Sequence, residues 1–224
     1  MIGIIPWGAY EQHGPVLPLN TDTIIASEFA NMIREKLKQV DVLPAIPYGV
    51  SVEHAGIEGT VYIDYKTALI MLESLLLSIS KSKKYSLVII LNGHGGNQNI
   101  SSAVCQNLNY TTEGTRFITL HVFPDRARRE AEKLFGEFSA HADSVESSVI
   151  ASLTGNYNNV ERIHLSDFNT KKALSHIMKL YPVKKISECG IISKTEQVEF
   201  DYKKGSEMVK ICVEELIGIG RAHV

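Results

Sequence analysis

Leu87-Val88-Ile89-Ile90-Leu91 is an uninterrupted apolar run, and Asn92-Gly93-His94-Gly95-Gly96-Asn97 follows it directly. Such a run is typical of a central parallel strand that is covered on both faces. The glycine-rich continuation places His94 at the carboxyl end of that strand, the edge where open α/β sheets bind their ligands. These residues therefore predict a class of fold and the edge of the sheet where a functional site is expected.

Strand and helix patterns alternate along the rest of the chain. Such alternation indicates a three-layer α/β/α fold with a mostly parallel central sheet and right-handed crossovers. The chain has 224 residues, a length that fits one domain, and we expect a single domain over residues 1–224. Apolar periodicity predicts further strands at 2–6, 42–46 and 115–122, and helices at 23–40, 67–80, 98–110, 126–134, 144–153, 169–180 and 202–217.

A second polar stretch, Gly8 to Thr23, follows the first predicted strand and leads into a helix. It contains three residues that commonly bind metals, Glu11, His13 and Asp22. Glu11 and His13 are two positions apart, and alternate side chains of an extended segment point the same way. Prolines and a glycine stiffen the loop that brings Asp22 back beside them. A carboxylate–imidazole–carboxylate set suits zinc, manganese or iron(II).

Each of these residues also has an ordinary structural explanation. Asp22 is a suitable helix N-cap, and His13 can be a turn histidine whose ring faces solvent. A lone histidine at the position of His94 is more often structural than a metal ligand. The combination of Glu11, His13 and Asp22 in one rigid loop after a strand favours a site, and beside them His94 becomes a plausible fourth ligand.

A third signal, His141-Ala142-Asp143-Ser144-Val145-Glu146, introduces the predicted helix at 144–153. An acidic residue in a first helical turn is ordinarily favoured by the helix dipole, which would explain Glu146 without a site. A glutamate on the apolar side of a helix needs a partner, however, and a metal ion is one. Both interpretations of Glu146 remain open at this point.

Composition excludes several classes of protein. Hydrophobic residues make up 44% of the chain and charged residues 21%, which is typical of a folded globular protein. A net charge of −2 gives no basic field for a nucleic acid partner. Three scattered cysteines indicate a reducing compartment, and no apolar run reaches the roughly 20 residues of a membrane span. We expect a cytoplasmic protein without a signal peptide, membrane or nucleic acid partner.

Other catalytic motifs match poorly. Residues 92–97 resemble a phosphate loop, but Gln98 stands where a dinucleotide fingerprint needs its last glycine. Gly49-Val50-Ser51-Val52-Glu53 nearly matches a hydrolase elbow, but Glu53 replaces its final glycine. No cysteine has an activating sequence context. Metal-dependent chemistry is therefore favoured over a serine or cysteine nucleophile.

The three signals together resemble the creatininase family of metal-dependent amidohydrolases, in order and over most of the chain. Glu11-x-His13-Gly14-x-x-Leu17-Pro18 with Asp22 is similar to the family's first metal motif, and residues 92–97 to its second. His141-Ala142 followed by Glu146-Ser147-Ser148 is similar to its His-Ala-x-x-x-Glu-Thr-Ser motif. The segment Tyr48-Gly49-x-Ser51-x-Glu53-His54 also resembles a family loop.

The resemblance implies a homo-oligomer with two divalent metal ions, zinc, iron(II) or manganese, in each active site. Glu11 and His94 would hold one ion, His13 the other, and Asp22 would bridge them. Glu146 would be a further ligand among the catalytic residues, and His141 would transfer protons. Two close ions lower the pKa of a bridging water and polarise a substrate carbonyl. A nearby histidine can protonate the departing nitrogen.

Departures from the family pattern bear on the substrate. Creatinine-hydrolysing members have Tyr-Glu at the position of Gly95-Gly96, and they surround creatinine with tryptophans, whereas this chain has only Trp7. The glycine pair is therefore expected to leave space in the site. The resemblance favours a small amide or formamide, with the formylamino-pyrimidine ribonucleotide of flavin and deazaflavin synthesis first. The alternative substrates are creatinine and a modified peptide. An alternative of another class is a catalytically silent, metal-stabilised binding or assembly module.

A ribonucleotide substrate would bring a phosphate that needs cationic partners at the rim of the cleft. Arg126, Arg128 and Arg129 follow the strand predicted at 115–122 and are candidates by position. The same arginines are also what the solvated start of a helix looks like.

Overall fold

A single four-stranded parallel sheet forms the centre of the structure, a computed structural model that describes residues 1–138, 141–157, 162–167 and 182–222. Its strands are β1 (Ile2–Trp7), β2 (Val40–Val42), β3 (Leu87–Asn92) and β4 (Arg116–His121), in the order β2-β1-β3-β4. The helices are α1 (Thr21–Lys36), α2 (Tyr65–Lys81), α3 (Gln98–Thr111), α4 (Asp125–Phe135), α5 (Ser144–Thr154) and α6 (Tyr202–Ala222).

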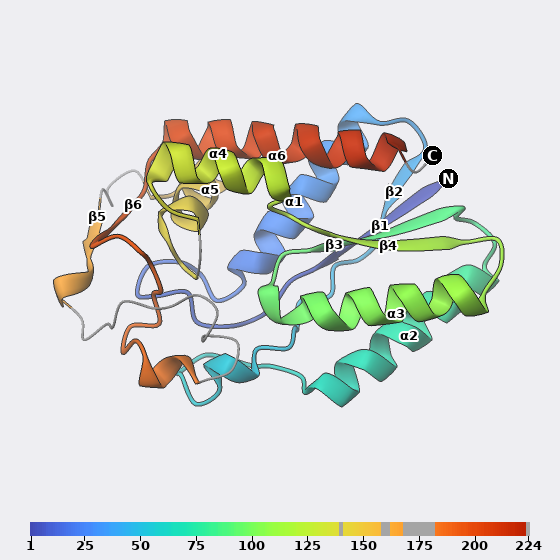
Figure 1. Cartoon of the computed structure of the whole chain (residues 1–224), viewed down its shortest axis with the longest axis horizontal. Coiled ribbons are helices and arrows are strands. Elements are labelled where there is room, and N and C mark those ends of the chain that lie inside the picture. The colour runs from blue at the N-terminus through green and yellow to red at the C-terminus, as the bar shows by residue number, and fades with distance from the viewer. Residues whose placement is uncertain (139–140, 158–161, 168–181, 223–224) are drawn as a thin grey trace.

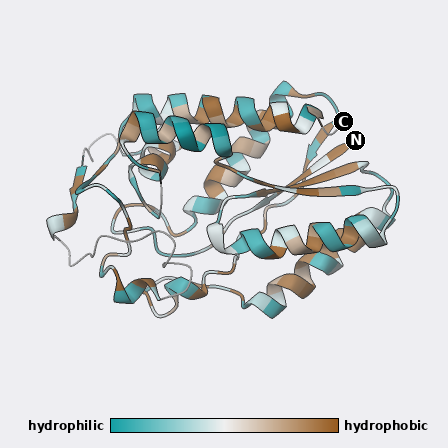
Figure 2. Cartoon of the chain, in the orientation of Figure 1, coloured by the Kyte–Doolittle hydropathy of each residue, from teal (hydrophilic) through white to brown (hydrophobic). Residues whose placement is uncertain are grey.

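Helices cover both faces of this sheet, as the three-layer prediction requires. In Figure 1, α2 and α3 lie below the sheet, and α1, α4, α5 and α6 lie above it. Leu87, Ile89 and Leu91 of β3 belong to the core on the α1 side, whereas Val88 and Ile90 belong to the core on the α2 side. Alternate residues of a strand point to opposite faces, so an uninterrupted apolar run supplies both cores at once. Figure 2 shows hydrophobic colour along much of the central sheet.

The segment predicted as a strand at 42–46 differs from the structure. The preceding helix ends at Lys36, the paired strand covers only Val40–Val42, and Ile46 forms an isolated bridge to Trp7. The amides of Leu43 and Ile46 do donate to β1, but Pro44 lies between them and has no N–H for the ladder. The chain therefore runs along β1 with an interrupted ladder.

A second, smaller sheet was not predicted. It pairs β5 (Arg162–His164) with β6 (Gln197–Glu199) in antiparallel register. Strands this short give little periodicity in the sequence. The helix predicted at 169–180 lies outside the described residues. No helix in the described part of the chain is both long enough and apolar enough to cross a membrane.

Candidate metal centre

The metal ligands predicted from the sequence meet at the carboxyl ends of β1 and β3. These strands are neighbours, and Trp7 pairs with Asn92, so the loops that follow them begin side by side. The loop after β1 carries Glu11 and His13, and the loop after β3 carries His94. All three side chains are buried, although they come from segments about eighty residues apart.

Asp22 enters the same site from the first turn of α1. The start of this helix packs against the end of β3, where a Cβ atom on Gly93 would lie 2.4 Å from the Asp22 carbonyl oxygen. Only glycine permits this approach without a shift of the helix. The contact sets the position of the Asp22 carboxylate, which is 2% exposed.

The carboxylates of Glu11 and Asp22 lie against two imidazoles. His94 Nδ1 is 3.2 Å from Glu11 Oε1 and 3.3 Å from Asp22 Oδ2. His13 Nε2 is 3.2 Å from the other oxygen of Asp22, Oδ1. The two oxygens of one carboxylate thus face two different histidines, an arrangement that suits a carboxylate bridging two ions.

Backbone carbonyls orient both imidazoles. His13 Nδ1 lies 3.0 Å from the Glu11 carbonyl oxygen, and His94 Nε2 lies 2.9 Å from the Val50 carbonyl oxygen. A carbonyl only accepts, so each of these nitrogens carries a hydrogen, and the opposite nitrogen of the ring is the one that faces the carboxylates and is available to a metal ion. Metal-binding histidines are commonly fixed in this way.

Three carboxylate oxygens in the site accept no hydrogen bond from the described residues. They are Glu11 Oε1, Glu11 Oε2 and Asp22 Oδ2, and all three are buried. Buried carboxylate oxygens that accept no hydrogen bond are costly, and metal coordination is one way to satisfy them. The oxygens converge with imidazole nitrogens that can coordinate once they lose their protons, so the donor set fits a divalent cation. Glu11, Asp22 and His94 form one such group of potential ligands.

His141 and Glu146 also reach the site, from the segment that begins α5. Glu146 Oε2 lies 4.0 Å from His13 Nε2, and these two residues form a further potential ligand group with His141. His141 Nε2 donates to the Gln12 carbonyl, which leaves His141 Nδ1 facing Glu11 Oε1 at 3.5 Å. All six residues that the sequence indicated therefore come together.

His54 is part of this cluster but was not predicted as a site residue. Its Nε2 lies 3.6 Å from Glu11 Oε1, and its ring centroid lies 4.3 Å from that of His141. The Gln12 amide donates from Nε2 to His54 Nδ1 at 2.8 Å, while Gln12 Oε1 accepts from the Gly14 amide. The family-like loop 48–54 was a signal for His54, but only the folded loop shows its distance from Glu11.

The metal-free site holds two imidazoles in the charged form. Burial opposes charge on His13, but the facing carboxylate of Asp22 outweighs it and raises the His13 pKa to about 10. Burial also lowers the pKa of His94, but the carboxylates of Glu11 and Asp22 outweigh it and hold this pKa well above its ordinary value. Burial raises the pKa of Glu146 to about 8.

The other two imidazoles are held neutral. Burial, together with His94 and His13, lowers the pKa of His54 to about 3. Burial, His13 and His54 hold the pKa of His141 well below its ordinary value. The site therefore contains charged histidines beside the carboxylates and neutral ones further from them.

Gly96 does not leave the space that the sequence suggested. A Cβ atom there would lie 2.0 Å from the Val50 carbonyl oxygen and 2.5 Å from His94 Nε2, whereas nothing lies within 4 Å of a Cβ atom on Gly95. The expectation is therefore wrong for Gly96, because the loop at residue 50 packs directly on it. Only Gly95 faces open space.

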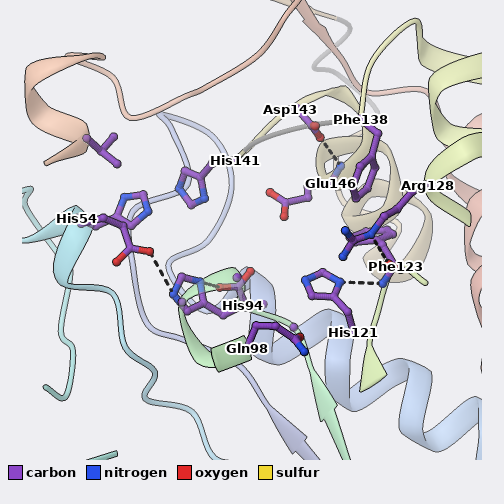
Figure 3. Close-up of a pocket in the computed structure, with 16 residues that line it drawn as sticks. His54, His94, Gln98, His121, Phe123, Arg128, Phe138, His141, Asp143 and Glu146 are labelled. Carbon is purple, nitrogen blue, oxygen red and sulfur yellow. Dashed lines mark hydrogen bonds and ion pairs between the residues drawn. The ribbon is translucent and has the colours of Figure 1, made fainter. Parts of the chain in front are cut away.

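A cavity of about 260 Å³ opens over the centre. Figure 3 shows His54, His94 and His141 on one side of it, and His121, Phe123, Arg128 and Phe138 on the other, with Glu146 between them. Sites for small molecules are commonly of about 300 Å³ or more, so the cavity suits a small ligand or the end of a chain. Of the three arginines predicted as phosphate contacts, Arg128 lines the cavity and the other two, Arg126 and Arg129, are exposed outside it.

Metal binding at pH 7 is expected to release about two to three protons, because ligands must lose their protons before they coordinate. One comes from each of His13 and His94, whose pKa values lie above the pH, and Glu146 adds up to one more. Metal affinity therefore rises with pH. Calorimetric titration of metal-free protein with zinc, in buffers of different ionisation enthalpy, measures the number of protons.

The exposed His164 supplies a control, because His164→Ala leaves the proton count unchanged while His13→Ala lowers it by one. A count near zero for the unsubstituted protein at pH 7 would contradict the charged state of these imidazoles.

Comparisons with known proteins agree with this geometry. A family model described as creatininase, creatinine amidohydrolase, matches residues 1–219. The chain is 30% identical over 220 residues to the mycofactocin precursor peptide peptidase of Mycolicibacterium smegmatis, covering 95% of this chain and 83% of the relative. It is 29% identical over 227 residues to the 2-amino-5-formylamino-6-ribosylaminopyrimidin-4(3H)-one 5'-monophosphate deformylase of Methanothermus fervidus. That match covers 96% of this chain and 82% of the relative.

The fold also matches a solved structure. The one titled "Creatininase Mn" has a TM-score of 0.75 at 16% identity, with 99% of this chain and 90% of that chain covered. The family model spans nearly the whole chain, including the segments that build the centre. The chain belongs to the creatininase family of amidohydrolases.

Proposed function

We propose that this protein hydrolyses an amide C–N bond at a centre of two divalent metal ions. The observation that carries the proposal is the buried Asp22 carboxylate, whose two oxygens face His13 on one side and His94 on the other. The unsatisfied oxygens of Glu11 beside it support the same conclusion. A binding module without catalysis would not need His141 beside this set.

The residues divide between two ions in this proposal. Glu11 and His94 hold one, His13 and Glu146 hold the other, and Asp22 bridges them. Zinc, manganese and iron(II) all suit such nitrogen and oxygen ligands, and the fold is shared with a manganese-titled creatininase. Ions held there would polarise a substrate carbonyl and lower the pKa of a water molecule.

His141 moves protons in this proposal. Its Nε2–H donates a hydrogen bond to the Gln12 carbonyl oxygen. The ring is neutral because its pKa is lowered, so Nδ1 faces the cluster unprotonated. Nδ1 can therefore accept a proton from the attacking water and pass it to the departing nitrogen. Contact with the rings of His13 and His54, whose centroids lie 4.2 Å and 4.3 Å away, limits its rotation.

Two variants separate metal binding from proton transfer. His141→Ala is expected to keep both metals and lose turnover by about 10²–10⁴-fold, because only proton transfer is removed. Asp22→Ala is expected to lose metal and turnover together, because its carboxylate serves both ions. Metal content by mass spectrometry and initial rates measure the two effects. Equal metal loss in both variants would contradict the division of roles.

A formamide is the proposed substrate, with a formylamino-pyrimidine ribonucleotide first. The deformylase relative is similar over nearly the whole chain, which supports this choice. The small cavity and the open space at Gly95 suit a compact substrate. The only tryptophan, Trp7, is fully buried and hydrogen-bonds through Nε1 to the Tyr48 carbonyl, so it offers no wall for a flat creatinine ring.

A peptide bond near the end of a peptide is the second candidate. It is favoured by the peptidase relative, which has the higher identity of the two. A two-metal centre polarises the carbonyl of the amide that is cleaved. This chemistry does not by itself distinguish a formamide from a peptide bond.

A direct comparison of substrates tests the proposal. Metal-loaded protein is given the formylamino-pyrimidine ribonucleotide, a short peptide and creatinine at equal concentration, with formate, free amine and creatine as products. We expect formate release to be fastest. Faster peptide cleavage would move the assignment to the second candidate, and creatinine turnover without formate would contradict both. A full complement of metal with no turnover would favour a binding module.

A further inference from the structure

Arg128 projects into the cavity from the start of α4, one strand along from the metal centre. The strand β4 ends at His121, which pairs with Asn92, and α4 begins four residues later at Asp125. Neighbouring strands are about 4.8 Å apart, so this wall lies within reach of a small substrate bound at the centre. Figure 3 shows the Arg128 side chain between Phe123 and Phe138.

The guanidinium group of Arg128 is held in place on two sides. Its Nε donates to the Phe123 carbonyl oxygen at 2.8 Å, and its Cζ lies 5.4 Å from the centroid of the Phe138 ring. These contacts leave the hydrogens on both terminal nitrogens for another partner. A half-buried guanidinium fixed in this way loses little freedom when it binds an acceptor.

No ion pair within 4.0 Å joins Arg128 to a carboxylate of the described residues, although Asp22, Glu53, Asp143 and Glu146 line the same cavity. Other cations do have such partners, as Lys133 has with Glu130. Among the described residues that line the cavity, Arg128 is the sole lysine or arginine. Away from the metal centre, Arg128 is therefore the one guanidinium or ammonium group that the described lining offers to an anionic ligand.

The start of α4 does not offer an alternative anion site. The amides of Arg126 and Ala127 already donate to the two carboxylate oxygens of Glu215, each at 2.9 Å. The amide of Arg128 donates to the Pro124 carbonyl. The side chain of Arg128, and not the helix terminus, is thus the group available to a ligand.

We propose that Arg128 binds the anionic group of the substrate, a phosphate or a carboxylate, and so selects substrates with a negative charge distant from the scissile bond. Two terminal nitrogens of a guanidinium match two oxygens of either group. This inference rests on the proposed amide hydrolysis, but it concerns selectivity and not the bond that is broken. Arg126 and Arg129 are exposed and lie outside the cavity, so the alternative explanation, solvated residues at the start of a helix, applies to these two.

Matched substrate pairs test this role. One pair is the formylamino-pyrimidine ribonucleotide and its nucleoside, and the other is a short peptide with a free C-terminal carboxylate and the same peptide as its C-terminal amide. The quantity compared is the ratio of kcat/KM for the anionic member to that for the neutral member. The pair with the larger ratio in the unsubstituted, metal-loaded protein identifies phosphate or carboxylate as the group that is bound.

Arg128→Met is expected to lower this ratio by about 10- to 100-fold, mainly through KM, because charge-assisted hydrogen bonds to the substrate are lost. Arg128→Lys keeps the charge without the planar pair of donors and is expected to restore part of the ratio. Arg126→Met and Arg129→Met, on the same helix, are the matched controls and leave the ratio unchanged. Thermal unfolding of all variants measures any loss of packing against Phe138.

An unchanged ratio in Arg128→Met overturns the proposal, as does a ratio near one in the unsubstituted protein. If Arg128→Met does not fold, the ratio in Arg128→Lys decides, and no decrease there overturns the proposal. If no substrate is turned over, the amide hydrolysis is wrong while the Arg128 proposal is still tested. Calorimetry then measures the affinity for the anionic and the neutral member of each pair. Tighter binding of the anionic member that Arg128→Met abolishes supports the Arg128 proposal, and equal affinities overturn it.

Discussion

Two buried carboxylates, those of Glu11 and Asp22, require positive charge beside them, and the arrangement of the site follows from that requirement. Their exposed fractions are 0% and 2%, so they are shielded from bulk solvent. An isolated charge in such surroundings is strongly unfavourable. Without a metal, protons on His13 and His94 supply the compensating charge, which is why the pKa values of these imidazoles are raised. Divalent cations would replace those protons at the same place, so one set of contacts accounts for both states.

The backbone determines where these groups lie. Parallel pairing of β1 with β3 aligns the ends of the two strands, and the start of α1 packs on the second of them through Gly93. The carbonyls of Glu11 and Val50 then fix which nitrogen of each histidine faces inward. Val50 belongs to the long loop between β2 and α2, which also brings His54 to the centre. That loop therefore both orients His94 and completes the imidazole cluster.

Much of this could be predicted from the sequence, because the informative features are local. The apolar run of β3 predicted a doubly covered strand, and the spacing of Glu11 and His13 predicted two side chains on one side of a loop. His54 was not identified, because its role depends on how a loop of irregular structure folds back over the site. The three arginines near the start of α4 could not be separated by sequence, since successive helical residues are about 100° apart and the buried face was unknown. In the structure Ala127 faces the core, and Arg128 faces the cavity.

The position of bound metal tests the central claim most directly. Crystals of the protein loaded with manganese or zinc can be measured at the absorption edge of the metal, where anomalous scattering locates each ion. We predict two peaks that share Asp22, one with Glu11 and His94 and one with His13, at roughly 2.0–2.3 Å from the ligand atoms. Ions bound elsewhere, or a loaded site in which His94 points away from Glu11, would contradict the account.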